Sequence, residues 1–166
     1  LMNVSHCEIT CLFNLKNSSL SSLVYLNELL MKFLEKEDPH EEIFDQYLSV
    51  CELLGSNSSE NIERKLREFE LILLREIGYG INLEFESLTN EPIEEEKSYS
   101  FSPSSGFKET NSTKGIKGLD IINFSKGNFE NISTRRSAKK IMREAIDFHL
   151  GNKNLNLRQF LIKKGA

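Results

Sequence analysis

The stretch IERKLREFELILLREIGYG, residues 62–80, decides the fold. Apolar side chains recur along it at intervals of four, three, four and four residues, the spacing of one continuous helical stripe. The stripe consists of Ile62, Leu66, Phe69, Leu73 and Ile77. Additional leucines and isoleucines make the second half apolar around most of its circumference. Such a helix is normally buried on several sides, so we expect it to be the central element and to end near Gly78.

Further amphipathic patterns predict helices that pack around this central one. The longer ones cover residues 20–36, 40–54 and 134–150, and shorter ones are expected at 119–124 and 157–163. The connections between the first three helices are short, which favours an antiparallel arrangement. The fold class predicted from these patterns is mainly α, a helical bundle around a central buried helix.

A small β-hairpin insertion is predicted at about residues 81–114. It opens with an acidic, polar segment, 84–97, which is typical of a solvated loop. Tyr99 and Phe101 alternate with serines, and a Ser-Ser-Gly turn then precedes Phe107, the pattern of a hairpin. Residues 108–115 are polar and are expected to form a loop.

The beginning of the chain has a different pattern. Residues 1–13 show an imperfect alternation of apolar side chains, which predicts a strand that would need a sheet to pair with. No leader of signal-peptide form and no apolar run of membrane-spanning length is seen. The three cysteines lack the spacing of a zinc ribbon and are expected to be reduced, as in a cytoplasmic protein.

No motif for catalysis is visible in the sequence. The three histidines, His6, His40 and His149, are far apart, and there is no metalloprotease helix, nucleophile elbow or phosphate-binding glycine loop. His149 is expected to be a packed core residue or a partner of a helix dipole rather than a catalytic base. We therefore expect a protein without enzymatic activity and without a cofactor.

Charge is distributed unevenly along the chain. The net charge of −4 arises from 20 acidic and 8 basic residues in 1–97 against 5 acidic and 13 basic residues in 98–166. The second part therefore has a net charge of +8, enough to attract a phosphate backbone although the whole chain is acidic.

The basic residues concentrate on one predicted helix. At helical spacing, Arg136, Lys139, Lys140 and Arg143 share a face, opposite an apolar face of Ile141, Ala145 and Phe148. The candidate DNA-binding residues are this set together with Arg135 and, further along the chain, Arg158. Their partner is either the acidic part of the same protein or a nucleic-acid backbone, and composition does not decide between them.

Several segments together resemble one known family. They are YLNELL at 25–30, DPH at 38–40, FDQYL at 44–48, RxFExxLL at 67–74, GYG at 78–80, YSFSPSSG at 99–106 and AKKIMREAIDFHLG at 138–151. In this order they resemble the helical C-terminal domain of RecO, a bacterial recombination mediator and DNA-annealing protein. The similarity covers nearly all of residues 20–163. It departs from the family at Leu157, where a serine is frequent.

The resemblance carries expectations about the domains. Family members begin with an OB-fold barrel, so residues 1–16 would be its last strand and a linker, and 17–166 the helical domain. Some members hold zinc with four cysteines in the insertion after the GYG turn. This chain has no cysteine after Cys51, so its insertion is expected to bind no metal.

The resemblance also implies partners. They are single-stranded DNA, RecR and the acidic C-terminal tail of single-stranded DNA-binding protein, in the bacterial cytoplasm at the nucleoid. A tail that ends in a carboxylate suits an arginine beside an apolar pocket. Arg67 is the first candidate for this contact, unless it forms a surface ion pair with Glu63 or Glu70. The weaker candidates are Arg64, Lys65 and Arg75.

A different class of function also agrees with the sequence. In a helical adaptor that binds only proteins, the basic helix would dock an acidic partner and make no contact with nucleic acid. Binding of nucleic acid by the chain distinguishes the two classes, since the adaptor would show none.

Overall fold

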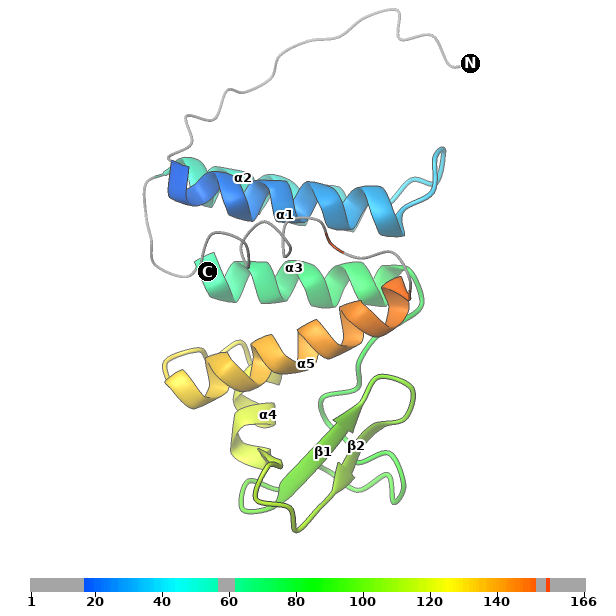
Figure 1. The fold of residues 1–166 in the computed structure, drawn as a ribbon, viewed down its shortest axis with the longest axis vertical. Coiled ribbons are helices and arrows are strands. Elements are labelled where there is room, and N and C mark those ends of the chain that lie inside the picture. The colour runs from blue at the N-terminus through cyan, green and yellow to red at the C-terminus, as the bar shows by residue number, and fades with distance from the viewer. Residues whose placement is uncertain (1–16, 57–61, 152–154, 156–166) are drawn as a thin grey trace, which may run out of the picture.

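The computed structural model describes residues 17–56, 62–151 and 155. Five helices and three short strands make up this part of the chain (Figure 1). Their bounds are α1 Asn17–Phe33, α2 Glu41–Gly55, α3 Ile62–Glu76, β1 Ser98–Ser102, β2 Gly106–Glu109, β3 Ile116–Lys117, α4 Gly118–Ser125 and α5 Ile132–Leu150. The prediction of a mainly helical fold with a small hairpin is confirmed. The expected strand at 1–13 and the expected helix at 157–163 lie outside the described residues.

Helix α3 is central to the fold, as its apolar stripe predicts. It packs against α2 on one side and α5 on the other, and α1 lies beside α2 (Figure 1). Phe69, Leu73 and Leu74 are fully buried, whereas the ends of the stripe are half-buried. Burial on opposite sides explains why α3 needs apolar residues around most of its circumference.

The helix α3 ends at a tight backbone turn. The N–H of Tyr79 donates to the carbonyl of Leu74 at 2.7 Å, and the N–H of Gly78 donates to the carbonyl of Arg75 at 3.0 Å. Gly78 has φ +84°, so these two bonds form the glycine-dependent Schellman motif. Helical hydrogen bonding therefore stops before Gly80, and Tyr79 is fixed at the corner.

The insertion forms a three-stranded antiparallel sheet in which β1 lies between β2 and β3. Phe101 pairs with Phe107 across the predicted hairpin, and Tyr99 pairs with Ile116 of the third strand. The prediction of a loop at 108–115 is wrong for Lys108 and Glu109, which belong to β2. Polar side chains are tolerated there because β2 is an edge strand with one face outward. Tyr99 and Phe107 join the same core as the helices.

The α4–α5 corner is fixed by a buried carboxylate. Asp120, 6% exposed, accepts hydrogen bonds from the hydroxyls of Ser133, Thr134 and Ser137 at 2.6, 3.0 and 3.2 Å. All three donors lie in the first two turns of α5. This network orients α5 relative to α4, and thereby the basic residues that α5 carries.

Candidate nucleic-acid interface

Helix α5 presents the predicted basic face to solvent. Its buried side consists of Ala138, Ile141, Met142, Ala145, Ile146 and Leu150. Arg136, Lys139, Lys140 and Arg143 are exposed on the other side, as helical spacing predicts. The apolar face was predicted to include Phe148 as well, and this is wrong. Phe148 is 54% exposed, because its position on the helix lies at the margin of the buried arc.

The basic residues of α5 differ in how much of their charge is available. Arg143 lies 3.8 Å from Asp147, and Arg135 is half-buried and donates to the carbonyl of Phe129 at 2.8 Å. Within the described ranges, Arg136, Lys139 and Lys140 form no ion pair with a carboxylate. Three exposed cations on one helical face are therefore free to attract an external anion. Arg158 lies outside the described residues.

The candidates for the peptide-tail contact are all engaged with carboxylates of the same protein. Arg64 and Lys65 share Glu68 at 2.6 and 3.0 Å. Burial raises the pKa of Glu68, but the hydrogen bonds from these two cations outweigh it and hold the pKa below its usual range.

Arg67 and Arg75 have very different surroundings. Arg67 is 8% exposed, and its Nη1 lies 2.9 Å from Glu70 Oε2. Arg67 therefore pairs with Glu70, one of the two partners expected from the sequence, but the pair is buried rather than at the surface. Arg75 is exposed and lies 2.5 Å from Glu42 and 3.3 Å from Glu76. An external carboxylate therefore has much easier access to Arg75 than to Arg67.

Arg75 also borders an open hollow on the surface. The hollow has a volume of about 460 Å³ and runs between α3 and the segment that follows it. Its apolar lining comes from Leu71, Ile72, Ile81 and Leu83. Glu84 also lines the hollow, so its charge is mixed. An arginine beside apolar side chains is nevertheless the chemistry expected to hold a peptide end with a carboxylate.

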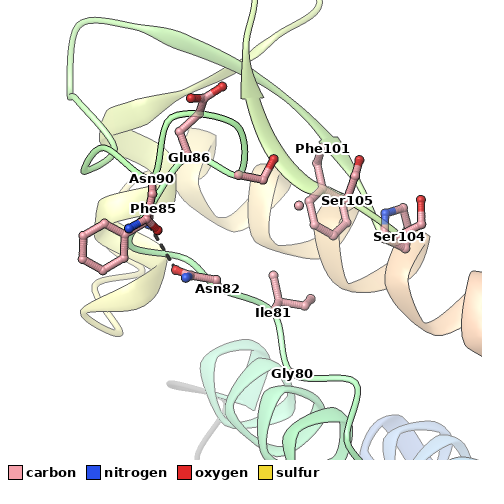
Figure 2. Close-up of a pocket in the computed structure, with 12 residues that line it drawn as sticks. Gly80, Ile81, Asn82, Phe85, Glu86, Asn90, Phe101, Ser104 and Ser105 are labelled. Atoms are coloured by element: carbon pink, nitrogen blue, oxygen red, sulfur yellow. Dashed lines mark hydrogen bonds between the residues drawn. The ribbon is translucent and has the colours of Figure 1, made fainter.

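A second hollow, of about 270 Å³, lies between the segment after α3 and the tip of the hairpin (Figure 2). Phe85 and Phe101 stand on opposite sides of it, and Asn82 lies between them. The side-chain oxygen of Asn82 accepts from the backbone N–H of Phe85 at 3.1 Å. The only ionisable side chain in its lining is Glu86, so this hollow does not favour a phosphate.

Cysteine and histidine, two common zinc ligands, are absent from the insertion. Residues 81–117 are all described and contain neither cysteine nor histidine. Among the described residues, no three histidine, cysteine, aspartate or glutamate side chains come together in a way that could hold a metal ion. In the same part of the chain, no helix combines the length and apolar composition that a bilayer-spanning segment requires.

Sequence reasoning missed one group of residues. Tyr79 and His149 stack with ring centroids 4.0 Å apart and planes 13° apart, and Phe148 contacts the same histidine edge-on at 5.0 Å. The signal available in the sequence was Tyr79 between two glycines, which marks a turn but does not reveal the partner 70 residues later.

Comparison with known proteins gives a consistent result. Residues 18–159 match the family model described as "Recombination protein O C terminal". A protein from Methylococcus capsulatus is 34% identical over 161 residues, covering 96% of this chain and 66% of the relative. A protein from Albidiferax ferrireducens is 31% identical over 156 residues, covering 87% and 62%. One from Proteus mirabilis is 34% identical over 158 residues, covering 92% and 64%. All three are named "DNA repair protein RecO", and the chain spans about three fifths to two thirds of their length.

Proposed function

The chain belongs to the RecO family, and from this premise we propose that it acts in DNA repair by binding the backbone of single-stranded DNA on the basic face of α5. The observation that supports this proposal is a contrast between two helices. Every arginine and lysine of α3 is neutralised by a glutamate, whereas Arg136, Lys139 and Lys140 of α5 form no ion pair in the described part of the chain. The structure thus favours an external anion over the protein's own acidic residues as their partner.

The mechanism is electrostatic and independent of base sequence. Lysine and arginine side chains on one face neutralise successive phosphates and release the counterions that had condensed on the strand. Affinity then falls steeply as salt rises, because the release of counterions into a more concentrated salt solution is less favourable. The hydroxyl network around Asp120 keeps α5 in place, so the cations are presented from a rigid element.

We further propose that the acidic tail of single-stranded DNA-binding protein docks in the hollow beside Arg75. Accessibility and apolar lining support Arg75 over Arg67, whose guanidinium is buried against Glu70. Arg75 is paired with Glu42 and Glu76 in this structure, so the carboxylate of the tail would have to replace these exposed partners. Joint work with RecR, strand annealing and recombinase loading are proposed for the whole protein, of which this chain corresponds to about three fifths to two thirds.

A titration with a labelled single-stranded oligonucleotide tests the DNA-binding proposal. The test variant combines Lys139→Glu with Lys140→Glu, and its matched control combines Lys114→Glu with Lys126→Glu, two exposed lysines outside α5 with the same total charge change. We expect wild-type affinity to fall about tenfold or more between roughly 50 and 200 mM salt, and the α5 variant to lose a similar factor at low salt. Equal effects of the two variants, or affinity that does not change with salt, would overturn the proposal. Binding of proteins but not of DNA would indicate the helical adaptor instead.

A labelled peptide that ends in apolar residues and a free carboxylate tests the tail contact. Arg75→Gln should weaken its binding about fivefold to tenfold, since a charge-assisted hydrogen bond is lost. Lys117→Gln, an exposed change elsewhere on the surface, is the control. Unchanged peptide affinity in Arg75→Gln would remove Arg75 from the contact while leaving the DNA-binding result unaffected.

A further inference from the structure

Three aromatic side chains form a contiguous cluster of ring contacts. They come from the C-terminal ends of α3 and α5, which lie close together in the fold (Figure 1). We call Tyr79, Phe148 and His149 the aromatic cluster. Tyr79 is 47% exposed and Phe148 is 54% exposed, although both rings contact the histidine. Single exposed apolar side chains are common on protein surfaces. Two large exposed rings that both contact the same histidine are less common, and contiguous exposed apolar groups often mark a binding site.

The cluster is built on rigid parts of the fold. Tyr79 sits in the hydrogen-bonded turn that ends α3, next to Gly78 with its positive φ. Phe148 and His149 belong to the last turn of α5, which ends at Gly151. Burial lowers the pKa of His149 below its usual range, so the imidazole is neutral near pH 7 and stacks on Tyr79 as an uncharged ring. Little ordering is therefore needed before another planar group can stack here.

We propose that the aromatic cluster is a stacking site for an unpaired base of single-stranded nucleic acid, with Phe148 and Tyr79 as the surfaces that the base covers. This inference rests on the proposed binding of the strand to α5 and adds a contact to the bases. Aromatic side chains bind every base through its ring face, which suits binding without sequence preference.

The position of the cluster on α5 agrees with this role. Phe148 follows Lys140 by eight residues, which corresponds to about 12 Å along the helix axis and about 80° around it. Both residues are exposed, so a strand whose phosphates lie on Lys140 and Arg136 can continue towards the cluster on the same helix. Phosphates would bind at one end of this path and a base at the other, the combination found in proteins that bind single strands.

The chemistry of the exposed residues favours a base over an apolar peptide. The other large exposed apolar side chains of the described chain are aliphatic except Phe44, and they do not form this cluster. A flat stack that carries a phenolic hydroxyl and an imidazole matches a planar heterocycle with polar edges better than an aliphatic side chain.

The absence of tryptophan from the chain gives a direct readout. Phe148→Trp introduces a single indole into the aromatic cluster, and Phe44→Trp places one at a similarly exposed position on α2. Adding a single-stranded oligonucleotide should quench the fluorescence of Trp at 148 and leave that of the Phe44→Trp control nearly unchanged. An oligonucleotide of the same length with abasic sites throughout should bind but fail to quench.

Affinities of alanine variants complete the test. Phe148→Ala should weaken binding of the normal oligonucleotide roughly fivefold to tenfold and leave the abasic one unaffected, because a stacking contact needs a base. Phe44→Ala, with a similarly exposed ring, should change neither. If wild type binds both oligonucleotides equally and Phe148→Ala has no effect, the stacking site is refuted while the proposed function stands. If wild type binds neither, the proposed function itself fails. Quenching by an apolar peptide but not by the oligonucleotide would also refute the base site.

Discussion

The guanidinium of Arg67 lies 2.9 Å from the carboxylate of Glu70, and both side chains are buried. Glu70 is fully buried and also accepts a hydrogen bond at 2.7 Å from the hydroxyl of Tyr25 in α1. The three side chains thus link the central helix to the first helix through a charged contact inside the core. Such a pair is far more costly to break than to replace as a whole.

Replacing Arg67 alone should destabilise the fold strongly. In Arg67→Gln the buried Glu70 loses its cation, and the free energy of unfolding should fall by about 3 kcal/mol. Replacing both partners, with Arg67→Met and Glu70→Leu, should recover most of the loss. Urea denaturation followed by circular dichroism measures these differences. Arg64→Gln is the control, because its exposed pair with Glu68 should contribute about 0.5 kcal/mol or less. If Arg67→Gln lowers the free energy of unfolding no more than the control does, the buried ion pair does not stabilise the fold as proposed.

The start of α4 depends on a residue without a side chain. A Cβ on Gly118 would lie 1.8 Å from the carbonyl oxygen of Glu94. The Gly118 N–H also donates to the backbone carbonyl of Lys97 at 2.8 Å. Gly118→Ala should therefore push apart the acidic loop and α4, lowering the free energy of unfolding by about 1–3 kcal/mol. Gly80→Ala is the matched control, since its Cβ would make ordinary contacts at 3.5 Å or more. Thermal unfolding of the two variants measures the difference. Equal midpoint temperatures would be evidence against the close approach of Gly118 to the carbonyl of Glu94.

A pH dependence is expected from Glu86. Its carboxylate accepts hydrogen bonds from the Thr89 hydroxyl at 2.5 Å, from the Thr89 N–H at 3.1 Å and from the Glu109 N–H at 3.2 Å. The hydrogen bond from the Thr89 side chain, with help from those two backbone groups, lowers the pKa of Glu86 from its usual value of 4.5. The folded state thus favours the ionised form. Its contribution to stability is fully present above pH 4.5 and is lost as pH falls through the lowered pKa.

Glu86→Gln separates this contribution from the titration of other carboxylates. The variant should be less stable than wild type at neutral pH, and the difference between the two should narrow on acidification, because protonated wild type loses the same interactions. Urea midpoints of both proteins, measured at about pH 7 and about pH 3.5, test this. A difference that stays constant over that interval would show that the ionised form is not the stabilised one.

The sequence predicted those features that depend on local spacing. The stripe from Ile62 to Ile77 identified the central helix, and the serine–aromatic alternation identified the hairpin, because a helix or strand imposes its period on its own residues. The third strand was missed, since two residues, Ile116 and Lys117, are too short to show a period. Helical spacing also placed the cations of α5 on one face.

Contacts between distant residues could not be predicted in this way. Arg67 was expected to be accessible, because nothing in the local sequence reveals that Tyr25, more than 40 residues earlier, and α1 cover its partner Glu70. The stack of Tyr79 on His149 joins the ends of two helices that only the tertiary fold brings together. The candidate site was therefore predictable as a set of charges on one helix, whereas the availability of each charge depends on packing.

Two acidic residues of α5 lie along the path that we propose for the strand, Glu144 and Asp147, and Asp147 is 3.8 Å from Arg143. Arg136, Lys140, Glu144 and Phe148 follow one another at intervals of four residues, so they form a row that winds around the helix by about 40° at each step. Glu144 is half-buried within that row, between the lysine and the aromatic ring. Its negative charge should repel a phosphate that passes from Lys140 towards Phe148. We therefore expect Glu144→Gln to bind single-stranded DNA more tightly than wild type, by about twofold to fivefold at low salt.

The gain in affinity of Glu144→Gln should shrink as salt rises, because salt screens the repulsion between a phosphate and a partly exposed carboxylate. Fluorescence anisotropy of a labelled oligonucleotide at several salt concentrations measures the effect. Glu91→Gln, an exposed change in the acidic loop, alters the net charge by the same amount and should leave affinity nearly unchanged. If both variants improve binding equally, only net charge matters and the strand does not follow this row. If Glu144→Gln weakens binding, Glu144 supports the orientation of the neighbouring cations, and the proposed path along α5 is incorrect.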